Sequence, residues 1–248
     1  YITKDGAFSR NHKEFKTVEH IKNAFKPLFE KLPDLVVDGE LYNHQFKNNF
    51  NRIISLVRKQ KPTAQELNEA NRYIQFHWYD YVLTRFENDT AVFKHRNDMI
   101  KRSVSELNSR HIIEVPTYDV SIIESAKLWH EEFLKQGYEG SIIRLNKPYE
   151  QKRSYNLQKF KDFQDAEATI TGWVEGQGKR TGTIGKFLAR DADGVEFGMP
   201  VMDDYKKMER MYDIAEWYIG KKATFTYFQR TPSGSYRHPL FKCIRDYE

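Results

Sequence analysis

The first part of the chain alternates between segments with helical spacing of apolar residues and short apolar runs. Residues 17–32 place apolar side chains three and four positions apart and end at Leu-Pro-Asp, where the apolar run 35–42 begins. A period near 3.6 predicts an amphipathic helix, and a short apolar run bounded by turn residues predicts a buried strand. The same reasoning predicts helices over 50–59 and 120–137.

Two further strands and one hairpin are predicted in this part. Residues 60–82 are expected to form a polar connection that leads into the aromatic strand Phe-His-Trp-Tyr-Asp-Tyr-Val. Residues 138–145 follow the glycine that ends the last helix, and their apolar run predicts a strand. Near the start, Asp5-Gly6 predicts the turn of a hairpin.

The pattern changes after residue 162. Residues 163–248 contain short strands separated by glycines and by Asp-Ala-Asp-Gly, and they close with a strand, a Pro-Ser-Gly turn and another strand. Such a pattern is typical of a small β-barrel or sandwich. We therefore expect two domains, with helices and strands mixed in residues 1–162 and strands dominating residues 163–248.

Composition excludes some classes of protein. The 248 residues carry a net charge of +5, and a modest excess of cations suits a protein that binds phosphate. Cys243 is the single cysteine, which excludes an internal disulfide or a multi-cysteine zinc site and fits a reducing compartment. Because no apolar run could span a bilayer and no leader is visible, we expect a cytoplasmic protein without a membrane role.

Two carboxylates stand beside glycines at predicted strand ends. Glu40 shares one side of its strand with Asp38, and Gly39 between them would permit a close approach. Glu139 precedes Gly140 at the start of another strand. Such a pair could hold a divalent metal and, through it, phosphate. Taken singly, each acid is equally well explained as a solvated surface residue or part of a turn.

Paired cations follow in the segment Leu-Gln-Lys-Phe-Lys-Asp-Phe. Lys159 and Lys161 are expected on one face of a strand, where like charges repel unless an anion lies between them. Counted together with Glu139 and Arg144, they favour a phosphate site. The alternative is an exposed edge strand that lysines protect from pairing with other chains.

The aromatic strand offers a surface for stacking. Phe76, Trp78 and Tyr79 cannot all face the core, because successive side chains of a strand alternate between its two sides. One of them could stack on a nucleotide base, although core packing also explains any single one.

Two basic clusters are candidates for contacts with nucleic-acid phosphates. One cluster lies on or near the predicted helix 50–59 and consists of Arg52, Arg58 and Lys59. The other lies in a predicted glycine-rich loop of the second domain and consists of Lys179, Arg180 and Lys186. We expect too few neighbouring acids to neutralise either cluster. Solvated surface charge is the alternative explanation.

Five motifs in a fixed order carry a resemblance to a known family. They are Ser-Arg-Asn-His-Lys-Glu-Phe, Asp-Gly-Glu-Leu-Tyr, Phe-His-Trp-Tyr-Asp-Tyr-Val, Tyr-Glu-Gly-Ser-Ile-Ile-Arg and Leu-Gln-Lys-Phe-Lys-Asp-Phe. In this order the chain resembles the covalent nucleotidyltransferases, above all the small ATP-dependent DNA ligases of bacteriophages and viruses. The resemblance implies an α+β nucleotidyltransferase (adenylation) domain with antiparallel sheets, followed by a small all-β OB-fold domain.

The resemblance also implies cofactors, a substrate and residue roles. ATP and Mg²⁺ would be the cofactors, and nicked double-stranded DNA would be the substrate of a monomer. In the first domain, the resemblance implies that Arg10 contacts the ribose or the nick phosphate, that Glu40 contacts the ribose and a metal, and that Tyr79 stacks on adenine. It implies that Glu139 binds metal, that Arg144 contacts a phosphate or the nick, and that Lys159 and Lys161 contact the α-phosphate. In the second domain, Arg245 and Asp246 would orient the ATP leaving group. Tyr247 stands where the family has a lysine after this aspartate.

The family's nucleophile is the lysine of a Lys-x-Asp-Gly motif. Lys4-Asp5-Gly6 lacks the spacer residue, and a hairpin turn explains it better. We therefore expect the nucleophilic lysine to precede Tyr1 in the intact enzyme, and this chain not to adenylate itself. An RNA ligase, a GTP-using capping enzyme and a non-catalytic module that binds nicks or ends remain alternatives.

Overall fold

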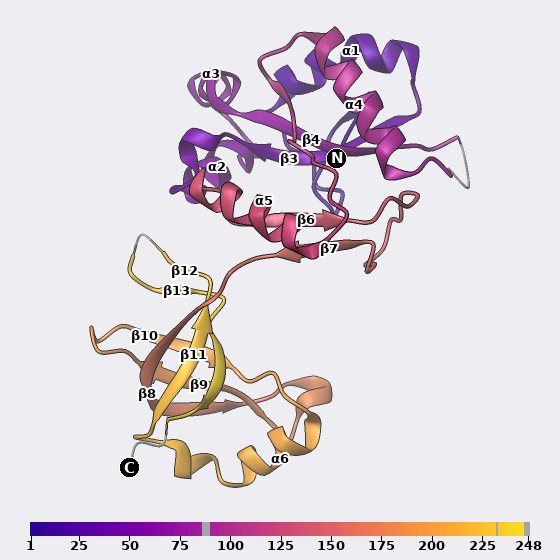
Figure 1. The fold of residues 1–248 in the computed structure, drawn as a ribbon. Helices are drawn as coiled ribbons and strands as arrows, with labels where there is room; N and C mark the ends of the chain where they lie inside the picture. Colours follow the sequence, from indigo (N-terminus) through magenta and orange to yellow (C-terminus); the bar gives the residue numbers. More distant parts are fainter. Residues whose placement is uncertain (86–89, 232, 246–248) are drawn as a thin grey trace. The chain divides into compact units, whose positions relative to one another are not determined.

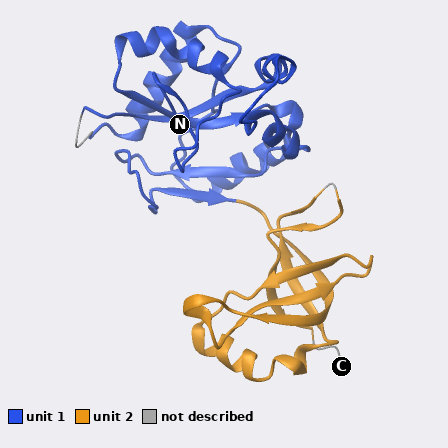
Figure 2. Cartoon of the chain, turned by 180° about the vertical axis from the view of Figure 1, so that it is seen from behind, with its two compact units in different colours: residues 1–160 blue, residues 161–248 orange. Residues whose placement is uncertain are grey.

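The chain folds into two compact units. The structure is a computed structural model that describes residues 1–85, 90–231 and 233–245. Its first unit is Tyr1–Phe160 and its second is Lys161–Glu248 (Figures 1 and 2). The sequence placed the change of domain after residue 162, close to this division.

A five-stranded sheet forms the centre of the first unit. Its strands run in the order β2-β1-β3-β4-β5, and their bounds are Ile2–Thr3 (β1), Gly6–Ala7 (β2), Leu35–Tyr42 (β3), Gln75–Leu83 (β4) and Ile112–Glu114 (β5). Neighbouring strands are antiparallel except for β4 and β5, which are parallel. The candidate site is built on the long central pair, β3 and β4.

The predicted hairpin at the start is present, with its turn one residue earlier than expected. Ile2 pairs with Ala7 and Thr3 with Gly6, so that Lys4 and Asp5 form the turn. Lys4 is exposed there.

Helices pack around this sheet, and its core is strongly aromatic (Figure 1). Their bounds are Glu19–Lys31 (α1), Phe50–Val57 (α2), Ala64–Tyr73 (α3) and Phe93–Leu107 (α4), with a short 3₁₀ turn at His44–Phe46. Phe76 and Trp78 alternate onto the core side of β4, and their rings meet the Phe25 ring edge to face with centroids 5.6 and 5.2 Å apart. Burial of these large side chains supplies much of the driving force for folding.

Helix α3 was missed in the sequence, where residues 60–82 were expected to be a polar connection leading into the aromatic strand; the strand is present as β4. Its start is nevertheless encoded, because Thr63 and Glu66 form a capping box. The Glu66 backbone N–H donates to Thr63 Oγ1 over 3.3 Å, and the Thr63 backbone N–H donates to the Glu66 carboxylate over 2.9 Å. The Thr-x-x-Glu spacing was the available signal. Helix α4 was not predicted either.

A second layer of this unit consists of helix α5 (Ile123–Lys135) and the antiparallel pair β6 (Ser141–Arg144) and β7 (Leu157–Phe160). His130 of α5 is buried, its ring stacks on Phe160 with centroids 4.1 Å apart, and its Nδ1 lies 2.9 Å from Ser141 Oγ. Among the described residues, the buried members of the main apolar core all come from residues 2–112, so this layer contributes none.

The second unit is a small β-structure with its own core. Its main sheet is antiparallel in the order β10-β9-β8-β11-β14, and the bounds are Gln164–Glu175 (β8), Ile184–Arg190 (β9), Glu196–Pro200 (β10), Lys222–Tyr227 (β11) and Leu240–Ile244 (β14). The edge strands β10 and β14 come within 8 Å of each other, which curls the sheet towards a barrel. The predicted α+β unit followed by a small all-β unit is thereby confirmed.

Shorter elements complete the second unit. They are helix α6 (Tyr205–Asp213), 3₁₀ turns at Gly178–Arg180 and Ala215–Tyr218, and the hairpin β12 (Gln229–Arg230) and β13 (Tyr236–Arg237). The hairpin surrounds the predicted Pro-Ser-Gly turn, of which Pro232 lies outside the described residues.

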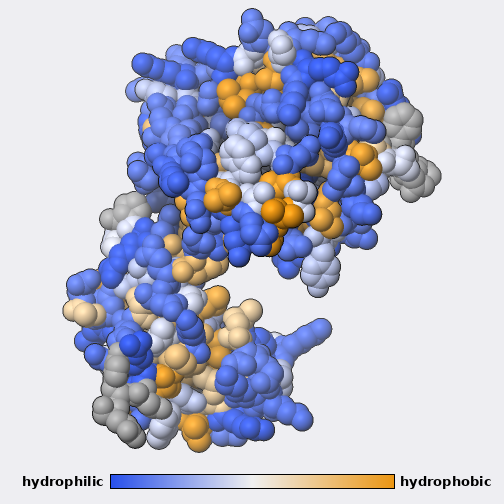
Figure 3. Space-filling model, in the orientation of Figure 1, coloured by the Kyte–Doolittle hydropathy of each residue, from blue (hydrophilic) through white to orange (hydrophobic). Residues whose placement is uncertain are grey.

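The surface is mostly hydrophilic, and apolar side chains reach it in scattered patches on both units (Figure 3). Within the described part of the chain, no helix combines the length and the apolar character that crossing a membrane requires.

We predict that His20 makes the first unit less stable in acid. Its Nε2 lies 3.1 Å from Ile74 O, and burial, with smaller effects of His111 and Arg110, lowers the pKa of His20 to about 4. Between this pKa and the ordinary value of about 6.5, the unfolded chain binds more protons than the folded one. The free energy of unfolding therefore falls as the pH drops through this window.

Denaturant titrations between pH 7 and pH 4 test this prediction. His20→Gln should flatten the pH dependence of the unfolding free energy, whereas His95→Gln, at an exposed position of α4, should leave it unchanged. A parental pH dependence in His20→Gln would refute the assignment.

Candidate active site

A bulge in β4 turns two neighbouring residues towards the candidate site. Asp38 of β3 pairs with Asp80, but Gly39 pairs with Trp78, so that Tyr79 is an extra residue in β4. A bulge breaks the strict alternation of a strand and redirects its side chains. Trp78 faces the core, whereas the side chains of Tyr79 and Asp80 both make polar contacts with other elements.

Glu40, Glu139 and Lys159 form one electrostatic group, although they come from β3, from the residues just before β6, and from β7. The Glu40 side chain still reaches solvent, but the protein atoms around its carboxylate displace much of its water, and this desolvation raises the pKa of Glu40. Lys159 acts against that rise, and Glu139 adds to it. Residues about a hundred positions apart therefore act on one carboxylate. Phosphate binding by this group stays a prediction.

Gly39 is required by the neighbouring strand. A Cβ at this position would lie 2.5 Å from the backbone oxygen of His77 and 2.5 Å from Cζ of Phe76. The sequence predicted that something approaches this glycine closely, and the structure shows that the neighbouring strand β4 does so.

Asp38 orients two tyrosines. Tyr79 donates its hydroxyl to Asp38 Oδ1 over 3.4 Å, and Tyr149, from the loop after β6, donates to Asp38 Oδ2 over 3.1 Å. Burial raises the pKa of both tyrosines, and the Asp38 charge raises it further, so both hydroxyls stay protonated and donate. The Tyr79 ring is thereby held at the edge of the site. Its stacking on adenine stays a prediction.

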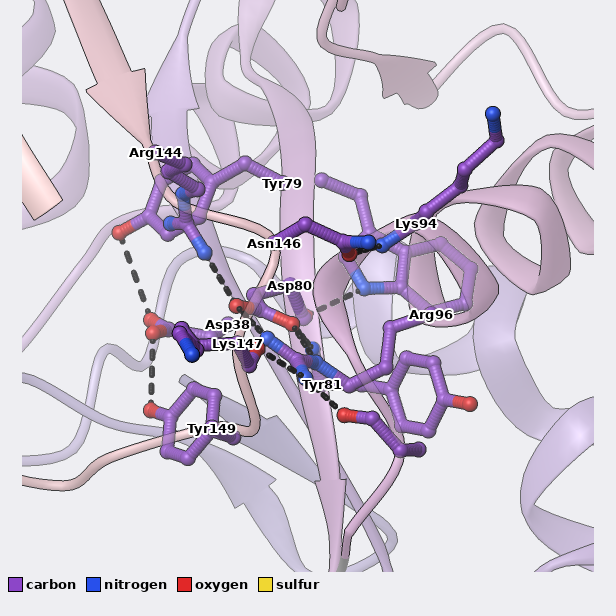
Figure 4. Close-up of polar contacts among 12 residues, drawn as sticks. Asp38, Tyr79, Asp80, Tyr81, Lys94, Arg96, Arg144, Asn146, Lys147 and Tyr149 are labelled. Atoms are coloured by element: carbon purple, nitrogen blue, oxygen red, sulfur yellow. Dashed lines mark hydrogen bonds and ion pairs between the residues drawn. The ribbon is translucent and has the colours of Figure 1, made fainter. Parts of the chain in front are cut away.

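A buried carboxylate with two guanidinium partners lies beside this group (Figure 4). Arg96 of α4 donates from Nε to Asp80 Oδ1 over 2.7 Å and from Nη2 to Asp80 Oδ2 over 3.1 Å, and Arg144 of β6 donates from Nη1 to Asp80 Oδ2. The side chains of Asp80 and Arg96 are 1% and 2% exposed, and that of Arg144 is 15% exposed. The predicted contact of Arg144 with phosphate or a nick would compete with this ion pair.

Sequence reasoning missed both Asp80 and Arg96. A signal for Asp80 existed, because simple alternation along β4 sends it to the same side as the core residues Phe76 and Trp78. A carboxylate in such a position needs a buried partner. Nothing local in the sequence identified Arg96 as that partner.

Three other predicted residues lie outside the elements that carry Glu40, Glu139 and Lys159. Arg10 is exposed in the turn after β2. Lys161 follows the end of β7 and belongs to the second unit, where its ammonium nitrogen lies 4.4 Å from the centre of the Phe228 ring. The expectation that it shares a strand face with Lys159 was therefore wrong, because β7 ends at Phe160. Arg245 pairs with Glu167 over 2.9 Å, and Asp246 lies outside the described residues.

The basic cluster on α2 has acidic neighbours, contrary to expectation. Arg52 forms an ion pair with Glu69, and Lys59 forms one with Glu66 over 2.9 Å. Both acids lie on α3, the helix that the sequence interpretation missed. Nucleic-acid binding by Arg52, Arg58 and Lys59 stays a prediction, but its premise of missing acids was wrong.

Lys179 and Arg180 lie in the 3₁₀ turn Gly178–Arg180, but Lys186 lies in β9, so its expected place in the glycine-rich loop was wrong. Arg180 differs from the two lysines. Its Nη2 donates to Val201 O over 2.7 Å and to Ile184 O over 3.3 Å, which fastens the loop to the sheet. Lys179 and Lys186 are exposed. These two lysines therefore keep the character expected of phosphate contacts, while Arg180 has a structural role.

Comparison with known proteins identifies the family. Residues 5–161 match the model of the ATP dependent DNA ligase domain, and residues 175–245 match that of the DNA ligase OB-like domain. The chain belongs to the ATP-dependent DNA ligase family, and the resemblance found in its motifs is confirmed.

Relatives and solved structures agree with this assignment. The DNA ligase of African swine fever virus is 29% identical over 189 residues, which cover 71% of this chain and 41% of that protein. The chain thus spans less than half the length of the curated relatives that it matches. A Lig E DNA ligase shares the fold, with a TM-score of 0.75 and 22% identity over 98% of this chain and 87% of that one. The bacteriophage T7 ATP-dependent DNA ligase, solved with ATP, has a TM-score of 0.53 and 17% identity over 97% and 85%.

We predict that Gly39→Ala destabilises the first unit by about 1–3 kcal/mol, because the added methyl group overpacks β3 against β4. Chemical denaturation measures this effect. Gly172→Ala is the matched control, since a Cβ there would lie 3.5 Å from Leu188 Cδ1, an ordinary contact distance. Equal stability of Gly39→Ala and the parent chain would show that the strands can separate without cost.

Proposed function

We propose that this chain is the nucleotide-binding and OB-fold part of an ATP-dependent DNA ligase that seals nicks through enzyme-AMP and DNA-adenylate intermediates. The observation that carries the proposal is the convergence of Glu40, Glu139 and Lys159 on one place in the first unit. A cation beside two carboxylates, with an oriented aromatic ring at the edge, suits a nucleoside phosphate. Membership of the ligase family supplies the reaction class.

The reaction depends mainly on position and charge. In nick sealing, the 3′-hydroxyl oxygen attacks the phosphorus of the adenylated 5′-phosphate, the new phosphodiester bond forms, and AMP leaves with the electrons of the broken P–O bond. Lys159 would stabilise the charge that builds up on the phosphate oxygens. Tyr79, oriented by Asp38, would hold the adenine, and Arg10 the ribose or the nick phosphate.

Mg²⁺ fits the site as a partner of two carboxylates. Within residues 1–85, 90–231 and 233–245, no group of three or more His, Cys, Asp or Glu side chains is placed to hold a metal. Mg²⁺ is commonly bound by one or two carboxylates together with substrate phosphates and water, and Glu40 and Glu139 provide such a pair. When bound, the ion would neutralise phosphate charge.

The proposed substrate is nicked double-stranded DNA, bound by a monomer. Two exposed lysines of the second unit, Lys179 before β9 and Lys186 in β9, would contact its phosphates. The family and its viral members favour action in the cytoplasm, which for a viral enzyme is that of the host cell.

A nicked duplex that already carries AMP on its 5′-phosphate tests this function directly, because sealing it needs no enzyme-AMP step. We predict sealing by this chain and a loss of at least about 100-fold in rate for Lys159→Ala. Lys152→Ala is the control, since Lys152 lies in the loop between β6 and β7 and pairs with Glu150 over 3.8 Å. Gel separation of the sealed strand gives the rate.

Other outcomes would select the alternatives. Sealing confined to RNA ends would indicate an RNA ligase. Transfer of GMP from GTP to RNA ends, on a chain extended before Tyr1, would indicate a capping enzyme. Tight binding of the nick without sealing would indicate a non-catalytic module.

We also predict that Lys179 and Lys186 contribute to the salt dependence of DNA binding. The double change Lys179→Ala and Lys186→Ala should reduce the slope of log K against log salt by about two units, roughly 0.9 for each lost phosphate contact. Fluorescence anisotropy of a labelled nicked duplex at several salt concentrations measures the slope. The double change Lys207→Ala and Lys242→Ala is the control, because these lysines pair with Asp203 and with Asp165. An unchanged slope in the first variant would remove Lys179 and Lys186 from the DNA interface.

A further inference from the structure

We propose that Asp80 is a positioning residue. Its buried carboxylate binds Arg96 and Arg144 at once, and it thereby fixes the layer that carries Glu139 and Lys159 against the sheet that carries Glu40. The inference rests on the proposed function only in taking these three residues to bind the nucleotide.

The second layer is fastened to the first sheet by polar contacts. The buried members of the main core come from residues 2–112 in the described part of the chain, so α5, β6 and β7 add no buried side chain to that core. The Arg144–Asp80 pair joins β6 to β4, and Tyr149 joins the following loop to Asp38 of β3 (Figure 4). A further polar contact lies at the other end of α5, where Lys47 Nζ donates to Gln136 O over 3.0 Å. At the site itself, hydrogen-bonded charges join the two halves.

Helix α4 takes part in the same junction. Val92, at its N-terminal end, makes no capping hydrogen bond through its side chain. The loop after β6 supplies the cap, since the Phe93 backbone N–H donates to Lys147 O over 3.1 Å and the Lys94 backbone N–H donates to Asn146 Oδ1 over 2.9 Å. Helix ends need such partners for their free N–H groups. Arg96, one turn further on, is therefore held where it meets Asp80.

The charges explain why Asp80 is the critical member. One carboxylate lies between two guanidinium groups, and without it two cations would face each other in a place with little water. Arg96 is deeper and also donates to Ala91 O and, over 3.3 Å, to Lys147 O. Arg144 is more exposed, and its guanidinium carbon lies 4.8 Å from the centre of the Phe93 ring. Loss of the Asp80 charge should therefore release Arg144, and β6 with it.

Amide hydrogen exchange tests the positioning role without any nucleotide. In Asp80→Asn, the amides of β6 and β7 should exchange at least about tenfold faster than in the parent chain, while those in the centre of β3 stay within about twofold. Arg144→Gln should have the same local effect. Because this variant keeps the Asp80–Arg96 pair, it serves as the test if Asp80→Asn does not fold. Asp165→Asn, which removes an exposed partner of Lys242, is the control. Unchanged exchange in β6 and β7 of Arg144→Gln would overturn the proposal.

Nucleotide affinity distinguishes positioning from direct contact. If Arg144 acts through Asp80, each of the single changes Asp80→Asn and Arg144→Gln should weaken ATP binding about tenfold or more. Because both changes break the same ion pair, the double variant should bind ATP at least as tightly as Asp80→Asn alone. Arg144→Lys should restore most of the affinity. If the loss of ATP affinity in the double variant equals the product of the losses in the two single variants, Arg144 contacts the nucleotide itself. This result would overturn the proposal. Absence of ATP binding by the parent chain would refute the proposed function, and the exchange experiment would still decide the role of Asp80.

Discussion

The ion pairs of Asp80 are the interaction on which the arrangement of the first unit depends. Asp80 lies on the central strand β4, Arg96 on α4 and Arg144 on β6, so one carboxylate joins three elements. A buried carboxylate is costly unless its hydrogen bonds are complete, and two guanidinium groups complete them here. The bulge at Tyr79 makes this possible, because it turns Asp80 away from the core side to which Trp78 points.

Stability and alignment have different physical origins in this unit. Aromatic packing of Phe25, Phe76 and Trp78 stabilises the sheet with its helices. The layer of α5, β6 and β7 is joined to the sheet by the Arg144–Asp80 ion pair and the Tyr149 hydroxyl, and to α4 by the helix cap. Directional contacts of this kind specify geometry more sharply than apolar burial does, since they are satisfied only over a narrow range of distance and angle. Such contacts suit a site whose catalytic power lies in placing charges.

The sequence predicted the residues whose signals are local. Glu40, Tyr79, Glu139 and Lys159 could be proposed for the site because each stands in a short sequence motif, and their binding roles stay predictions. Residues whose roles depend on distant partners were missed or misjudged. The pairing of Arg52 with Glu69 required α3, and the hydrogen bonds of Arg180 required knowing that Val201 O and Ile184 O lie beside it. Arg96 reaches Asp80 only because α4 packs beside β4, which no local pattern of residues could show.

The charges of the site explain why it would favour a bound cation. Desolvation and the nearby carboxylate of Glu139 both raise the pKa of Glu40, so the fold holds two acids together at a cost in free energy. Lys159 offsets part of that cost. A divalent cation between Glu40 and Glu139 would offset more, and by linkage its binding would lower the pKa of Glu40. In the proposed function, the alignment maintained through Asp80 would keep Glu40, Glu139 and Lys159 acting on the same bound nucleotide.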